Sequence, residues 1–358
     1  MPTVNERIQD ELTHRDIELE RYKRGVIVRV LKLLGVLEES VVARLQQLDP
    51  TAVQARYRDA RLARLLAEVG QLVDTYGSAL EQDVLPDLRS LAKDESKFGV
   101  RMFDGVLPAG VALETIAPAA ATLQAAVMSR PFQGRLLKEW VGDHPPAVRA
   151  RLRGVIRQGV AEGQTIAQII TAVRGTAANG YRDGIIEVSR NGADAMVRTA
   201  VAHTVSAARE VTYDANPDLL KGVRMVATLD SRTSLFCMTI DGKVYPVNKG
   251  PRPPFHVRCR TTTVPVVKSW KELGLSIADG DDGTRASMDG QVAEGVTYGK
   301  WLRGKPAAFQ DDVLGATKGA LFRRGELPIE KFVDNSGKAY TLDELRRREP
   351  AAFERAGL

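Results

Sequence analysis

Strand-like patterning is confined to one short part of this chain, and this constrains the fold to a mainly helical one. In the first 140 or so residues, apolar side chains recur near helical spacing, as between Ile8 and Leu37, while Glu, Arg and Lys fill the gaps. Residues 49–51 (Asp-Pro-Thr) predict a helix stop followed by a new N-cap. We therefore predict a second helix over 52–73 and a third over 79–93.

Further helices are predicted over 148–163, 165–173 and 193–215, and strand signals begin only after them. Residues 223–229 alternate in the manner of a half-buried strand. The pair Asp241-Gly242 predicts a hairpin over 240–244, because it tolerates the positive φ angles of a tight turn. Residues 261–267 predict another strand, at a sheet edge because of Pro265. Residues 271–297 show little periodicity and predict a loop or linker, and helical patterning returns from Lys300.

The fold class expected from these patterns is α+β and mainly α. A long helical N-terminal region is followed by a compact core of helices packed on a small antiparallel sheet, and then by a helical C-terminal tail. The corresponding segments are 1–145, 146–268, a linker over 269–299, and 300–358.

Composition narrows the functional classes. The chain has 358 residues, 44% of them hydrophobic, and no apolar run of about 18 residues that could span a bilayer. The N-terminus is polar where a signal peptide would be apolar, and two cysteines fit synthesis in a reducing cytoplasm. The net charge of +6 is concentrated in residues 195–270, which hold 11 Lys/Arg against 5 Asp/Glu. A basic surface there would attract phosphate or an acidic protein; a solvated, partly ion-paired face is the structural alternative.

Both cysteines lie in this basic segment. Cys237 is followed after eighteen residues by His256, and after two more by Cys259. Three such groups could ligate zinc, one short of a closed structural site. Asp230 or Asp241 could complete the shell. Cys237 and His256 could instead be the nucleophile and base of a thiol hydrolase, although no oxyanion donor or orienting group stands at a recognisable spacing. Asp230 and Arg232 could be an acid and an anion clamp, but an Asp two residues before an Arg more often caps a turn.

The segment resembles the phage head morphogenesis family, the minor head proteins related to the F protein of phage Mu. The similarity is carried by Arg198-Thr199, then Asp230-Ser231-Arg232-Thr233, then Asp241-Gly242-Lys243-Val244-Tyr245, and finally Pro253-Pro254-Phe255-His256-Val257-Arg258-Cys259-Arg260. It is specific from about residue 149 to 267. The chain departs from the family pattern at Ser234 and Thr261, where relatives often carry cysteines, and at Ala227, in a strand that often carries tryptophan.

The resemblance implies a minor head protein that acts in head assembly and in DNA packaging or ejection, as a virion component and not as an enzyme. The implied partners are the portal protein, capsid or scaffold proteins and double-stranded DNA bound without sequence preference; no membrane, cofactor or metal is expected. Its motif residues form an expected structural cluster: Arg198, Thr199, Asp230, Arg232, Thr233, Cys237, Asp241, Gly242, Pro254, His256, Cys259 and Arg260. Candidate contacts to DNA or an acidic partner are Arg224, Arg252, Arg258 and Arg260. The alternatives are a Cys-His hydrolase, a toxin-like transferase, and a zinc-stabilised binding module.

Overall fold

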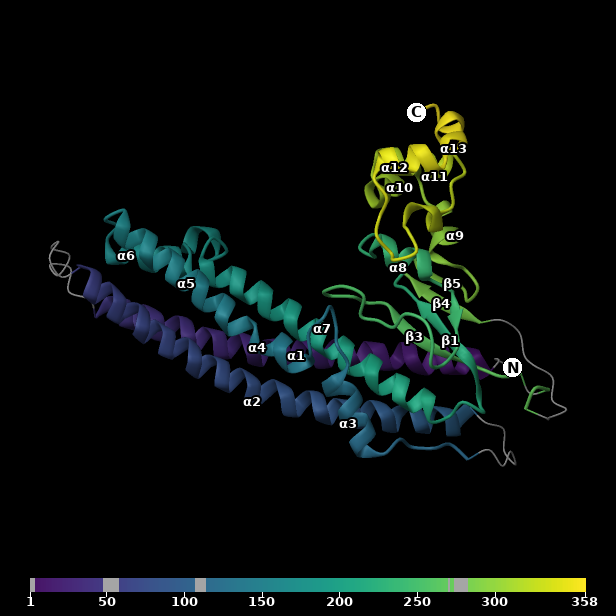
Figure 1. Cartoon of the computed structure of the whole chain (residues 1–358), viewed down its shortest axis with the longest axis horizontal. Helices are drawn as coiled ribbons and strands as arrows, with labels where there is room; N and C mark the ends of the chain where they lie inside the picture. Colours follow the sequence, from purple (N-terminus) through teal and green to yellow (C-terminus); the bar gives the residue numbers. More distant parts are fainter. Residues whose placement is uncertain (1–3, 48–57, 107–113, 270, 274–282) are drawn as a thin grey trace.

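The computed structural model describes residues 4–47, 58–106, 114–269, 271–273 and 283–358. Long helices lie side by side in an arm, with a small sheet at one end and a lobe of short helices standing beside that sheet (Figure 1). The α+β, mainly helical class expected from the sequence is confirmed. None of the described helices combines the length and hydropathy that a bilayer crossing requires.

Three long helices build the arm: α1 (Val4–Gln46), α2 (Arg58–Val106) and α7 (Ile185–Asp214). The described residues of the helices predicted over 52–73 and 79–93 are helical, but the break predicted between them is wrong, because α2 runs through both ranges. Val73, Tyr76 and Leu80 are buried along one side of it, so packing outweighs the weak helix propensity of Gly77. A Cβ at Gly77 would lie 3.1 Å from Pro145, which explains the glycine. The helix stop predicted at 49–51 lies outside the described residues.

Shorter helices cover the arm: α3 (Ala120–Ser129), α4 (Leu137–Gly142), α5 (His144–Ala161) and α6 (Ile166–Arg174), with a 3-10 turn, η2 (Ala177–Asn179), before α7. The prediction of helices near 148–163 and 165–173 is confirmed. The α6 helix begins at Thr165, whose side chain accepts a hydrogen bond from the Gln168 amide.

One buried cation joins the three long helices close to the sheet. Arg209 of α7 donates to Glu95 of α2 at 2.7 Å and to Asp16 of α1 at 3.0 Å. A third bond reaches the hydroxyl of Thr262 at 2.6 Å. The side chains of Arg209 and Glu95 are 3% and 0% exposed. Removing one partner of so buried a pair leaves the other charge uncompensated, so this contact fixes how the helices meet.

The sheet has three antiparallel strands in the order β2 (Val244–Tyr245), β1 (Leu220–Val226), β3 (Thr262–Val267). Val223 pairs with Tyr245 on one side and with Pro265 on the other. The alternation predicted from residue 223 and the edge position of the Pro265 strand are confirmed. Apolar side chains of the sheet pack on the start of α1 and the end of α2, forming a cluster with Ile8, Leu12, Met102, Phe103, Val223, Met225, Val264 and Val267 among its members.

The hairpin predicted at Asp241-Gly242 is wrong. A short helix, α8 (Leu235–Ile240), precedes the pair, and its first turn is capped by Ser234. Gly242 has φ 79°, as the turn chemistry requires. The chain, however, turns from a helix into β2, which pairs with β1 and not with residues before the turn.

The segment predicted to be a linker holds a hairpin, β4 (Thr284–Ser287) and β5 (Gly290–Ala293), so the loop prediction is wrong there. The helical C-terminal region is confirmed, with α9 (Tyr298–Arg303), α10 (Ala307–Leu314), α11 (Ala316–Arg323), the 3-10 turn η3 (Ile329–Phe332), α12 (Leu342–Arg348) and α13 (Pro350–Ala356). Its core includes Trp301, Phe322 and Phe332 and extends to Leu229 and Met238 of the motif segment. The domain boundaries stay a prediction.

Candidate functional site

The motif residues gather where α7, the end of β1, α8 and the loop before β3 meet. Thr199 on α7 accepts a hydrogen bond from the Arg258 amide at 3.0 Å and donates to the Ala195 carbonyl at 2.7 Å. The Arg258 backbone has φ 60°, an uncommon conformation for a side-chain-bearing residue. Thr199 therefore holds the proline-rich loop against the helix, whereas Arg198 pairs with Asp194 and Glu20 on the long helices.

Asp230 caps the turn that follows β1. Its carboxylate accepts hydrogen bonds from the Arg232 amide at 3.0 Å and the Thr233 hydroxyl at 3.2 Å. Arg260 grips both of its oxygens. Burial alone would raise the pKa of Asp230, but the hydrogen bonds and charge of Arg260 lower it below its ordinary value. The Arg232 side chain points into solvent, 81% exposed and 3.9 Å from the carboxylate. This geometry supports the turn-capping interpretation over an acid with an anion clamp.

Asp241 is the buried junction between the motif and the C-terminal part of the chain. Its fully buried carboxylate accepts from the amides of Ala227 and Tyr298, each at 2.7 Å. Arg285 on β4 donates to its two oxygens at 2.9 and 3.1 Å. Sequence reasoning missed Arg285, because it lies in the expected linker and its partner is 44 residues away. The sequence around Arg285 contains no pattern that predicts the burial of its side chain.

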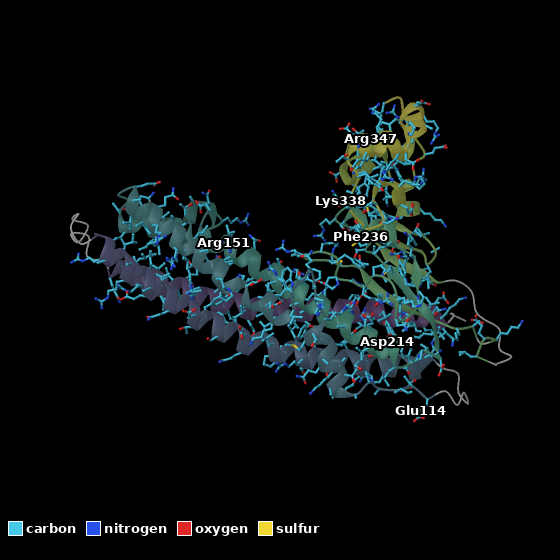
Figure 2. All side chains as sticks on the ribbon, viewed as in Figure 1. Glu114, Arg151, Asp214, Phe236, Lys338 and Arg347 are labelled. Atoms are coloured by element: carbon cyan, nitrogen blue, oxygen red, sulfur yellow. The ribbon has the colours of Figure 1, made fainter. Side chains whose placement is uncertain are left out.

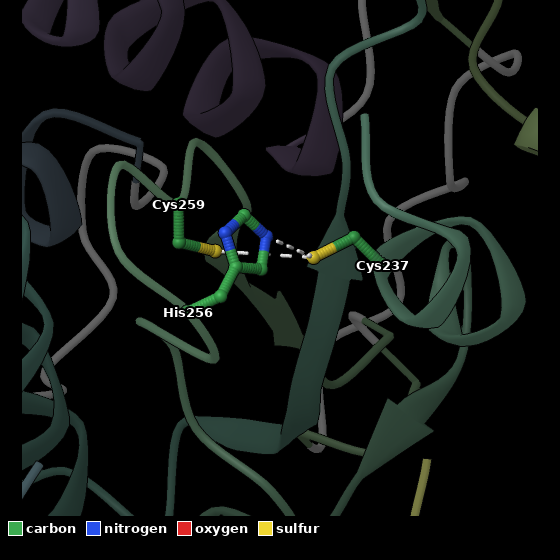
Figure 3. A group of neighbouring side chains, drawn as sticks. All are labelled: Cys237, His256 and Cys259. Atoms are coloured by element: carbon green, nitrogen blue, oxygen red, sulfur yellow. Dashed lines mark hydrogen bonds between the residues drawn. The ribbon is translucent and has the colours of Figure 1, made fainter. Parts of the chain in front are cut away.

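Cys237, His256 and Cys259 lie together (Figure 3). The Cys237 Sγ is 3.8 Å from the Cys259 Sγ and 3.4 Å from the His256 Nε2. The other ring nitrogen, Nδ1, is 2.9 Å from the Val257 carbonyl. Both thiols are free and buried. The preceding prolines, Pro253 and Pro254, are joined by a cis peptide bond and are both buried.

These contacts set the protonation of the two thiols. The hydrogen bond between them, and then burial, raises the pKa of Cys237. The same hydrogen bond, reinforced by His256, lowers the pKa of Cys259 to about 4. His256 in turn has its pKa raised, chiefly by its hydrogen bond to Cys259. Both thiols are buried, which limits the access of a substrate to either sulfur.

All four arginines expected to contact DNA or an acidic partner have carboxylate partners in the chain. Arg224 pairs with Glu294, Arg252 with Glu210, Arg258 with Asp194 and Arg260 with Asp230. The Arg252 side chain is 3% exposed and also donates to backbone carbonyls of its own loop. The Arg258 side chain is 47% exposed. Contact with an external partner stays a prediction, and Arg258 is the best placed of the four to make it.

Comparison with known proteins finds a family model that matches part of the chain. Residues 150–264 match the family model described as phage Mu protein F like protein. The matched stretch covers most of α5, then α6, α7, β1, α8 and β2, and ends within β3, so it holds the whole motif cluster except its Arg285 partner. No curated protein and no solved structure matches the chain. Residues 150–264 are thus similar to the phage Mu F-like head morphogenesis family.

Proposed function

We propose that the protein is a minor head protein located at the portal vertex of a tailed phage, where it acts structurally in head assembly and in the packaging or ejection of DNA. The observation that carries this proposal is the family match over the motif cluster. The burial of both Cys237 and Cys259 supports a structural role for the cluster over thiol catalysis.

The helical arm is the proposed docking element for portal or capsid. Along α1, three large apolar side chains are about half exposed or more: Ile17, Val28 and Val36. Gly25 and Gly35 lie among them, and a Cβ built at either would meet nothing within 4 Å. Small residues between exposed apolar ones let another protein element approach closely. This side of α1 therefore has the features of a contact face for a protein partner.

Double substitution tests that face. Val28→Asp together with Val36→Asp places charge where burial is proposed, without removing any buried side chain, and should abolish incorporation into proheads while the purified protein keeps its helicity. Met288→Asp in the β4–β5 turn is the control, since Met288 is 55% exposed and lies away from α1. Unchanged incorporation of the double variant would refute docking through α1.

The proposed DNA contact is tested by the salt dependence of duplex binding, because phosphate contacts weaken as ionic strength rises. Arg258→Ala should reduce the slope of log affinity against log salt by about one. Arg29→Ala is a matched control: its side chain is 43% exposed and it too is ion-paired, with Asp83. Binding that stays flat with salt, or equal effects of both substitutions, would argue against a DNA contact at the motif.

The overall proposal is tested by quantitative mass spectrometry of purified full virions and DNA-free proheads, counting this chain relative to the portal protein. A few copies in both particles are expected for a protein of the portal vertex, and loss from particles after DNA release would add a role in ejection. Absence from both particle types would refute the proposal.

A further inference from the structure

The side chains of Cys237, His256 and Cys259 bring three potential metal-ligand atoms close together. They come from two segments: the first turn of α8 and the loop before β3. The two sulfurs and a ring nitrogen all lie within 4.8 Å of one another. Around them, Ala227 and Phe255 complete a small apolar cluster. A compact set of soft ligands in apolar surroundings is the composition of a zinc or related thiolate site.

The distances between these atoms can be compared with those that zinc imposes. With bonds of about 2.3 Å to sulfur and about 2.05 Å to nitrogen at tetrahedral angles, two sulfurs stand about 3.8 Å apart, and a sulfur and a nitrogen about 3.55 Å apart. The structure has 3.8 Å between the sulfurs and 3.4 Å between Cys237 and His256. A disulfide needs its sulfurs at about 2.05 Å. Two of the three distances therefore match those around a shared zinc ion, and the third, between Cys259 and His256, is within 4.8 Å.

The histidine is oriented for this role. The Nδ1 of His256 donates to the Val257 carbonyl at 2.9 Å, which leaves Nε2 directed at the Cys237 sulfur (Figure 3). Metal-bound histidines are commonly fixed in this way, through a hydrogen bond from the other ring nitrogen. The backbone positions the cysteines as well: the Cys237 amide donates to the Ser234 hydroxyl, and the Cys259 amide donates to the His256 carbonyl.

We propose that Cys237, His256 and Cys259 together bind one zinc ion, with a solvent molecule as the fourth ligand. In the described part of the chain no other His, Cys, Asp or Glu joins the group. The acids suggested by the sequence are engaged elsewhere, Asp230 by Arg260 and Asp241 by Arg285. Cys259 lines a cleft of about 510 Å³ between α1, α7 and the sheet.

This site is independent of the proposed role in the head, and it differs from the sequence expectation of no metal. That expectation came from Ser234 and Thr261, which stand where relatives often carry cysteines. Three protein ligands and one water make a complete tetrahedral zinc shell. The ion would join the start of α8 to the proline-rich loop, so its binding energy would contribute to the folding energy of the motif cluster.

The test uses the full chain, purified under reducing conditions, stripped with a chelator and then titrated with zinc or cobalt. We expect one metal ion per chain, a thiolate-to-cobalt charge-transfer band, and a rise in thermal midpoint on adding zinc. Cys237→Ser and His256→Ala should lose stoichiometric binding, while His14→Ala, which removes an exposed histidine on α1, should retain it.

A gain-of-ligand variant keeps the test decisive if those substitutions impair folding. Thr261 lies close enough to Cys237 to affect the pKa of its thiol, so Thr261→Cys brings a further thiolate beside the site and should tighten zinc binding and intensify the cobalt band. Folded, reduced protein that takes up neither metal and gains no stability from zinc would overturn the proposal. So would rapid oxidation of Cys237 and Cys259 to a disulfide in the presence of zinc, because bound metal protects its thiolates.

Discussion

The buried pair of Asp241 and Arg285 offers a quantitative test of how the motif segment is joined to the C-terminal part of the chain. Replacing Asp241 with Asn retains the shape but removes the charge that compensates a 6% exposed guanidinium. One carboxylate oxygen, which accepts from a backbone amide and from Arg285, becomes an NH2 group that faces two donors. Leaving a buried partner charge uncompensated costs about 3–5 kcal/mol.

Urea unfolding followed by circular dichroism measures this cost. With a slope of about 3 kcal/mol/M, the midpoint should fall by about 1 to 1.7 M. Hydrogen exchange should locate the effect, since the amides of Ala227 and Tyr298 donate to Asp241 and should lose protection first. The double variant Asp241→Asn/Arg285→Gln should be less destabilised than the sum of the single variants.

The control is Asp289→Asn, which breaks an ion pair with Lys305 whose Asp side chain is 51% exposed. An exposed pair of this kind contributes about 1 kcal/mol or less. If Asp241→Asn were as mild as the control, the argument that this buried carboxylate unites the motif with the C-terminal lobe would be refuted.

Three further results are expected. Arg260 lowers the pKa of Asp230 below 3.8, so their pair stabilises the protein above that pH, and the stabilisation is lost as the pH falls through the lowered pKa. The loss of stability between pH 7 and pH 3 should therefore be smaller in Asp230→Asn than in the unsubstituted protein. An unchanged pH profile would contradict this. Gly242→Ala should lower the free energy of unfolding by about 1–2 kcal/mol because of the positive φ, and by more because the new Cβ would lie 2.9 Å from Thr297. Gly163→Ala, at φ 70° in open space, should show the conformational cost alone. Equal urea midpoints of the two variants would contradict the steric contact. A thiol-reactive dye should label metal-free Cys237→Ala slowly, since Cys259 is buried, and rapid labelling of the folded variant would contradict that burial.

Sequence reasoning succeeded where a local pattern decides the structure. The alternation from Val223 and the proline in the 261–267 run identified β1 and the edge strand β3, because side-chain burial and a missing amide are properties of the strand itself. For Asp241-Gly242, the sequence correctly predicted a turn with a positive φ angle, but not which elements the turn connects. A two-residue turn signal does not reveal that a Ser-capped helix precedes it.

What could not be predicted depends on contacts between distant residues. Arg285 is charged and lies in a segment of low periodicity, and only the carboxylate of Asp241 makes its burial favourable. The spacing of Cys237, His256 and Cys259 allowed a shared site but could not establish it, because the loop that brings them together is held by Thr199 on α7. The ion pairing of the four candidate arginines was likewise invisible without the fold.

The Arg209 contact with Glu95 and Asp16 has a mechanical consequence for so elongated a protein. From Asp16 to its end at Gln46, α1 extends about 45 Å at the rise of an α-helix, so a tilt of about 5° at the clamp would displace the distant tip by about 4 Å. A small change in the angle of α1 is therefore enough to misplace the far end of the arm. Damage to this one clamp could therefore spoil the alignment of the arm with its neighbours while every residue at the tip remained intact.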